Sequence, residues 1–182
     1  MLNDKKIIIF PGAFQSVKNY GDYEGVDIWL KNKSKQDIPN ADYCIAHSLG
    51  ANFIFAQSNI QKKKIILINP LIKRRNVFNL FLRWIVFYFS EGIEKKKIVP
   101  VNNWIFALGR IFRLRKTNVL DAVIKMPKED VVIIRGRKDC FFCDKESAKI
   151  IKKNDLTLIE VEAGHDWNEK IAEAVDNILK SK

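Results

Sequence analysis

Five short runs of apolar, mostly β-branched residues place the strongest constraint on how this chain can fold. Most of the runs are apolar almost throughout instead of alternating with polar residues, which is typical of strands covered on both faces. Patterns typical of helices follow three of the runs, over residues 49–58, 145–152 and 168–179. This alternation predicts an α/β fold with a doubly wound, mainly parallel sheet of five or six strands. The runs are residues 6–10, 43–46, 65–68, 131–135 and 156–161, and a sixth strand is expected over residues 26–30.

A basic segment interrupts this alternation between the third and fourth runs. The 182-residue chain carries a net charge of +11, and residues 71–116 alone hold 11 basic and 2 acidic residues. The same segment contains two stretches in which apolar residues recur at helical spacing. We therefore expect a single domain over residues 1–182, with a helical cap inserted in it at residues 71–125. The two apolar stripes are Val77, Leu80, Phe81, Trp84, Ile85 and Tyr88, and Trp104, Ile105, Leu108, Ile111 and Phe112.

The basic cap has three interpretations. In the first, its apolar faces cover the sheet while its Lys and Arg side chains are solvated. In the second, the basic residues make peripheral contact with an anionic membrane surface, as basic amphipathic helices do. In the third they bind nucleic acid, which we do not expect, because the aromatic residues follow helical stripes that suit burial and no nucleic-acid-binding motif is present.

We expect neither a signal peptide nor a disulfide framework. The first apolar run has only four residues before Pro11, fewer than the roughly 7 to 15 of a signal peptide core. The most apolar stretch, residues 77–89, is shorter than the ~20 residues that span a bilayer and contains Asn79 and Arg83. Three cysteines in a chain of this length do not make a disulfide framework. We expect a soluble cytoplasmic protein.

Residues with nucleophilic or acid–base chemistry follow three of the predicted strands. Ser48 follows the second strand, Asp139 the fourth and His165 the fifth. Ligands of parallel sheets bind outside the carboxyl ends of the strands, so these side chains should meet there. A nucleophilic serine needs an imidazole to take its proton, and the imidazole needs a carboxylate to fix its tautomer. The order Ser, Asp, His provides all three groups.

The residues around Ser48 favour a sharp turn from a strand into a helix. Such a turn needs small residues two positions before and two positions after the serine, and these are Ala46 and Gly50. The segment Ala46-His47-Ser48-Leu49-Gly50 resembles the G-x-S-x-G motif of the α/β-hydrolase family, with Ala in place of the first Gly. The resemblance is to small serine-hydrolase members with a short sheet, and it covers nearly the whole chain outside the cap.

This resemblance assigns a role to each candidate residue. The backbone N–H groups of Leu49 and of Ala13, in the loop after the first strand, would form an oxyanion hole. Phe14 and His47 are expected to line the substrate pocket. The nucleophile, the acid and the base implied by the resemblance are Ser48, Asp139 and His165.

Other interpretations of these residues stay open. Ser48 could simply cap the helix that follows it. Asp144, which is also expected to cap a helix, and Asp166, next to the histidine, are alternatives to Asp139 as the acid. His47 is a poor base for Ser48, because neighbouring residues at a strand end point apart.

Two cysteines form a Cys-x-x-Cys pair, which can bind zinc or exchange disulfides. Zinc needs about four ligands, and no second pair lies at a suitable spacing from Cys140 and Cys143. A redox pair of the thioredoxin type would open a helix early in the chain. We interpret the pair as two thiols beside the acid loop, and Cys44 as a core residue.

These observations predict a serine hydrolase of the carboxylesterase, lipase or thioesterase type. It would cleave a small-molecule acyl substrate, most simply a carboxylic ester, through an acyl-enzyme and without a metal or organic cofactor. The alternative is a non-catalytic binding protein of the same fold that uses its basic, aromatic cap to contact lipid or a protein partner.

Overall fold

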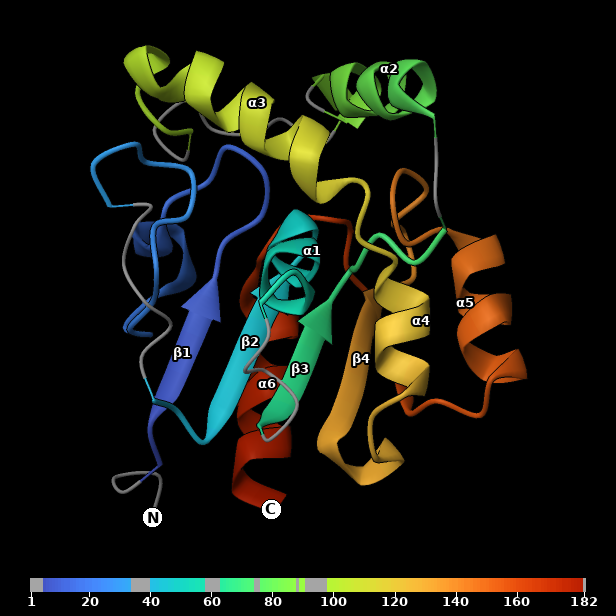
Figure 1. Cartoon of the computed structure of the whole chain (residues 1–182). Coiled ribbons are helices and arrows are strands. Elements are labelled where there is room, and N and C mark those ends of the chain that lie inside the picture. Colours follow the sequence, from blue (N-terminus) through green and yellow to red (C-terminus); the bar gives the residue numbers. More distant parts are fainter. Residues whose placement is uncertain are drawn as a thin grey trace.

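Five parallel strands form one sheet, in the order β1-β2-β3-β4-β5 (Figure 1). The computed structural model describes residues 5–33, 40–57, 63–73, 76–87, 89–90 and 98–181. Its parallel sheet confirms the predicted α/β class, and the carboxyl ends of the strands share one edge. The strands are β1 (Ile7–Phe10), β2 (Tyr43–His47), β3 (Lys64–Ile68), β4 (Val131–Gly136) and β5 (Leu158–Val161).

Helices cover both faces of the sheet, which explains why most residues of its strands are apolar. Helices α1, α4 and α5 pack on one face, and α6 packs on the other, behind the sheet in Figure 1. Successive strand residues alternate between two cores, so that Ile8 and Cys44 belong to the first core while Ile9 and Ile45 belong to the second. The bounds are α1 (Leu49–Phe55), α4 (Val119–Ile124), α5 (Lys145–Lys153) and α6 (Glu169–Ser181).

The predicted sixth strand over residues 26–30 is wrong. An isolated bridge joins Ile9 to Gly25, and the chain turns away after it. The amide of Ile28 donates to the carbonyl two residues earlier at 2.8 Å, which is a turn and not a ladder bond. Ile28 and Trp29 are fully buried, so this loop is apolar because it is buried and not because it pairs with a strand.

Two helices lie across the carboxyl edge of the sheet, α2 (Val77–Phe87) and α3 (Trp104–Leu114) (Figure 1). Helix α4, which also falls within residues 71–125, packs beside α1 on the sheet. Residues 74–75, 88 and 91–97 of this segment lie outside the described residues, as does residue 58 at the end of the predicted helix over 49–58. Tyr88 of the first predicted stripe is therefore not placed. Short 3-10 turns occur at η1 (Val17–Tyr20), η5 (Val101–Asn103) and η6 (Lys128–Asp130).

Among the helices of the described ranges, none combines the length and the apolarity that a membrane span requires.

Candidate active site

Ser48 lies at the sharp turn from β2 into α1. Its φ of 51° is in the left-handed region that residues other than glycine rarely adopt. Its amide donates to the carbonyl of Ile68 at 2.8 Å, which ties the turn to the end of β3. Helix α1 then passes so close to β1 that a Cβ atom at Gly50 would lie 2.3 Å from the carbonyl oxygen of Phe10. The turn therefore requires a small residue at position 50.

The Ser48 side chain contacts an imidazole and does not cap the helix. Its Oγ makes no capping bond to α1, and it lies 3.0 Å from Nε2 of His165 in the loop after β5. Both side chains are buried. The fold thus brings together two residues that are 117 positions apart in the sequence.

Asp139 holds the other side of the imidazole. Its Oδ2 lies 2.7 Å from Nδ1 of His165. Burial alone would raise the pKa of Asp139, but His165 and the backbone N–H groups of Phe142 and Cys143 outweigh burial and hold the pKa well below its ordinary value. The carboxylate therefore stays charged and accepts the Nδ1 proton, which leaves the Nε2 lone pair facing Ser48.

The two alternative acids are engaged elsewhere. Asp144 caps α5, because its Oδ1 accepts from the amide of Ser147 at 3.0 Å. Oδ1 of Asp166 accepts from Nε2 of Gln15 at 2.6 Å. Of the three candidate acids, Asp139 is the one whose carboxylate is placed against the Nδ1 atom of His165.

Two backbone amides beside Ser48 are available to a ligand. Leu49 is the first residue of α1, where an N–H group has no partner within the helix. Within the described residues, neither this amide nor that of Ala13 donates a hydrogen bond to the protein. Both residues line the same pocket as Ser48. The amide of Gly12, in contrast, donates to the hydroxyl of Tyr20 at 2.8 Å.

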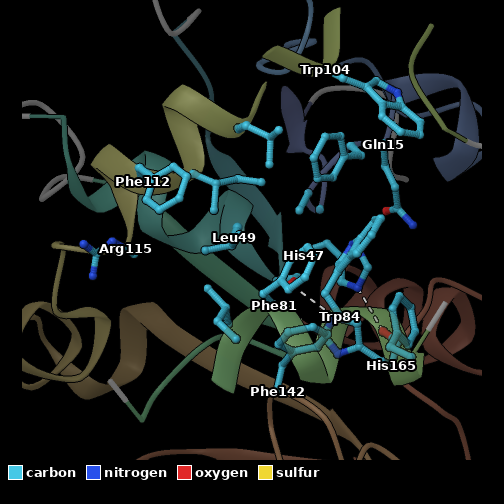
Figure 2. Close-up of a pocket in the computed structure, with 18 residues that line it drawn as sticks. Gln15, His47, Leu49, Phe81, Trp84, Trp104, Phe112, Arg115, Phe142 and His165 are labelled. Atoms are coloured by element: carbon cyan, nitrogen blue, oxygen red, sulfur yellow. Dashed lines mark hydrogen bonds between the residues drawn. The ribbon is translucent and has the colours of Figure 1, made fainter. Parts of the chain in front are cut away.

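An apolar cavity of about 230 Å³ opens at Ser48 and His165 (Figure 2). Eight of its 18 lining residues come from α2 and α3, so the two predicted apolar stripes face the site in part. Phe14, which was expected there, lines the cavity and packs against Trp84 and Trp104 at ring-centroid distances of 5.4 and 5.9 Å. Ile105 of the second stripe does not face the cavity: its side chain is 87% exposed. The stripe residues that line the cavity are Leu80, Phe81, Trp84, Trp104, Leu108, Ile111 and Phe112.

The sequence matches no family model and no curated protein. The structure is similar to an alpha/beta hydrolase enzyme from a Medee basin deep-sea metagenome library, with a TM-score of 0.58 and 15% identity over 98% of this chain and 89% of that one. It is also similar to a monoacylglycerol lipase from Paleococcus ferrophilus (TM-score 0.53, 14% identity, 96% and 93% of the chains). A third similar structure is an esterase from Pyrococcus furiosus, with a TM-score of 0.53 and 18% identity over 98% of this chain and 82% of that one. The chain has the α/β-hydrolase fold.

Within this α/β-hydrolase fold, His47 lines the cavity but is held by buried neighbours. Its Nε2 lies 2.9 Å from the carbonyl oxygen of His165, and because a carbonyl only accepts, Nε2 carries the proton. Its Nδ1 lies 2.7 Å from the hydroxyl of Tyr20. Burial, followed by the nearby charge of His165, lowers the pKa of His47 to about 4. His47 is therefore neutral near pH 7, with both ring nitrogens occupied.

Tyr20 and Gln15 connect His47 to the loop after β1, and the sequence pattern did not identify either residue. The Tyr20 hydroxyl contacts Oε1 of Gln15 as well as the His47 ring. Burial raises the pKa of Tyr20, so the hydroxyl keeps its proton. The same hydroxyl accepts the amide of Gly12, next to Ala13. These bonds fix the loop that carries one of the two available amides.

Asn69 is a second residue that sequence reasoning missed. It follows β3 directly, is fully buried and has a φ of 44°. Its Nδ2 donates to the carbonyl of His165 at 2.7 Å, and its Oδ1 accepts the amide of Gly136 at 2.8 Å. Asn69 therefore holds the histidine loop against the end of β4. A polar residue directly after a buried strand is the signal that could have identified it.

The Cys140–Cys143 segment contributes its backbone to the site. Amides of residues 141, 142 and 143 donate to the carboxylate of Asp139 at 2.9 to 3.1 Å. Burial, with the charge of Asp139, raises the pKa of the Cys143 thiol. Cys44, Cys140 and Cys143 form no disulfide, and the described residues contain no cluster of three or more His, Cys, Asp or Glu that could hold a metal ion.

Proposed function

We propose that this chain is a serine hydrolase that cleaves acyl substrates, most simply carboxylic esters, through an acyl-enzyme. The observation that carries the proposal is the hydrogen-bonded series Ser48–His165–Asp139, which opens into an apolar cavity. Similar structures named as a lipase and an esterase support hydrolase chemistry on this fold. The chain alone supplies every group that the reaction steps below use.

In the first step, Oγ of Ser48 attacks the carbonyl carbon while Nε2 of His165 takes its proton. The negative charge that develops on the carbonyl oxygen is stabilised by the amides of Leu49 and Ala13, which have no competing acceptor among the described residues. The imidazolium then gives its proton to the leaving alcohol, and the acyl group stays on Ser48. Water activated by His165 releases the acid in the second half of the reaction.

Asp139 stabilises the imidazolium in both halves. Its low pKa keeps the carboxylate charged while the proton resides on His165. Rings pack around the imidazole, with Phe142 at a centroid distance of 4.5 Å and Phe87 at 5.1 Å. This packing limits rotation of the imidazole, so the base is oriented before the substrate arrives.

The cavity favours an apolar acyl or aryl group on the substrate, because aromatic and aliphatic side chains of α2 and α3 form its walls. Hydrolysis of p-nitrophenyl esters of graded chain length measures this preference. We also propose a cytoplasmic location, which suits three cysteines that form no disulfide.

A fluorophosphonate probe tests the function, since it labels only an activated serine. We expect the wild-type chain and a Ser181→Ala control to be labelled, because Ser181 is a surface residue at the end of α6. The Ser48→Ala variant should not be labelled. A folded wild-type chain that resists the probe would instead support a non-catalytic binding protein.

A further inference from the structure

Helix α2 carries apolar side chains on both of its faces. Leu80 and Phe87 point inward and are buried, whereas Phe78 and Val86 point outward and are 68% and 55% exposed. Apart from Asn79 and Arg83 the helix is apolar, and apolar side chains on both faces of a helix normally have an apolar environment on each. The protein supplies that environment on one side of α2 only.

The outward face of α2 belongs to a larger apolar surface. Within the described residues, six large apolar side chains are more than half exposed, and all six lie on α2, on α3 or on residues next to them. We call this surface the cap face. Large exposed apolar side chains that gather on two helices covering the same edge of the sheet are typical of a binding site for a partner or a membrane. The six side chains are Phe78, Phe81, Val86, Phe89, Val101 and Ile105.

The cap face is also positively charged. Residues 76–87, 89–90 and 98–118 include five Arg or Lys and no Asp or Glu. Arg113 and Lys116 lie eight and eleven positions after Ile105, so all three share the exposed side of α3 and the turn that follows it. Within the described part of the chain, neither of these two cations forms an ion pair.

We propose that the cap face docks on an anionic lipid bilayer surface, with its apolar side chains in the headgroup boundary and its cations on the lipid phosphates and carboxylates. Exposed apolar groups beside basic ones on a helix suit this interface. A second copy of the chain would bring the same cations face to face, which opposes self-association. The phosphodiester backbone of a nucleic acid would leave aliphatic groups such as Val86 and Ile105 without an apolar environment.

Docking would also place the cavity at the bilayer. Phe81 and Phe112 line the cavity and are 53% and 48% exposed, so its rim is part of the cap face. Figure 2 labels both residues among those that line the cavity. An apolar substrate could then leave the bilayer and enter the cavity without crossing water.

Vesicle sedimentation tests the apolar part of the proposal. The vesicles contain roughly one third phosphatidylserine in phosphatidylcholine, compared with phosphatidylcholine alone. We expect the chain to bind the anionic vesicles, and the double variant Phe78→Ser/Ile105→Ser to bind at least about tenfold more weakly. Neither residue lines the cavity, so hydrolysis of a water-soluble ester should not change. The control is Ile124→Ser on α4, which is 47% exposed outside the cap face and should bind normally.

A charge variant tests the electrostatic part. Each basic residue near an anionic surface adds about 1 kcal/mol, so Arg113→Gln/Lys116→Gln should weaken binding roughly 30-fold. The matched control, Lys149→Gln/Lys170→Gln, removes two exposed cations from α5 and α6 and should bind as the wild type does.

Three results would overturn the proposal: no binding to anionic vesicles, equal loss of binding in the controls, or a dimer in solution that the Phe78→Ser/Ile105→Ser variant dissociates. Salt-sensitive RNA binding that the charge variant abolishes, with no vesicle binding, would identify a nucleic-acid surface instead. The Ser48→Ala variant retains the cap face and should bind vesicles normally. The docking proposal and the proposed chemistry can therefore fail separately.

Discussion

Lowering the pH from 7 to 4 should destabilise the protein through His47. This histidine is 1% exposed, and in the unfolded chain its pKa is 6.5, whereas burial and the charge of His165 lower it to about 4 in the fold. Between these values the unfolded chain binds a proton that the folded chain does not, so acid favours unfolding. At about 1.4 kcal/mol per pKa unit, the difference between the two pKa values corresponds to a loss of about 3 kcal/mol in the free energy of unfolding. Typical domains have a free energy of unfolding of about 5–15 kcal/mol, so the effect is large.

Urea unfolding followed by tryptophan fluorescence, at pH steps from 7 to 4, measures this loss. The comparison is His47→Gln, which retains an N–H donor for the carbonyl of His165 but does not titrate. The difference in free energy of unfolding between the two proteins should shift by about 3 kcal/mol in favour of the variant as the pH falls. Asp139 does not interfere, because its stabilisation is lost mainly below its unfolded value of 3.8 and because both proteins contain it, so its contribution cancels in the difference. Parallel pH profiles for the two proteins would refute the reasoning.

Two substitutions with matched controls test the site and its turn. Asp139→Asn should lower kcat by roughly 10³- to 10⁴-fold, because the carboxylate no longer fixes the imidazole. Asp144→Asn should keep both its activity and the α5 cap, because the side-chain oxygen of asparagine caps a helix about as well as that of aspartate. Equal activity losses in both would count against Asp139 as the acid. Gly50→Ala should prevent folding or cost more than about 3 kcal/mol, since the new Cβ meets the Phe10 carbonyl at 2.3 Å, whereas Gly109→Ala, with no atom within 4 Å, should add about 0.5–1 kcal/mol. Thermal unfolding decides this comparison, and a mild Gly50→Ala variant would contradict the close approach.

The sheet could be predicted because burial on both faces leaves a recognisable pattern in the sequence. Residues 131–134 of β4, for example, are apolar at successive positions, because alternate side chains pack into the two cores. The same reasoning failed at residues 26–30, where a loop is buried without pairing. Trp29 there donates its Nε1 proton to the carbonyl of Pro11, a contact between distant residues that local composition does not encode.

The site could be predicted in part for a similar reason. Ser48, Asp139 and His165 each follow a strand that is itself recognisable, so their meeting point follows from the topology. Tyr20 has no such pattern, and Asn69, which does follow a strand, gives no sign of its partners, because these are fixed only when loops from different strands pack together. Local patterns therefore identify the three side chains that meet but not the residues that hold them.

Backbone strain at the carboxyl edge of the sheet shows why the residues that hold the site are needed. Phe14, Ser48 and Asn69 have φ angles of 59°, 51° and 44°, and they lie in the loops that follow β1, β2 and β3. Each such conformation costs about 1–3 kcal/mol, so the surrounding contacts must over-determine it. Those contacts are the buried network of His47 and Tyr20, and the bonds from Asn69 to the histidine loop. The amides and the imidazole are therefore held in place by the folded chain, and an acyl substrate would bind to a site that is already formed.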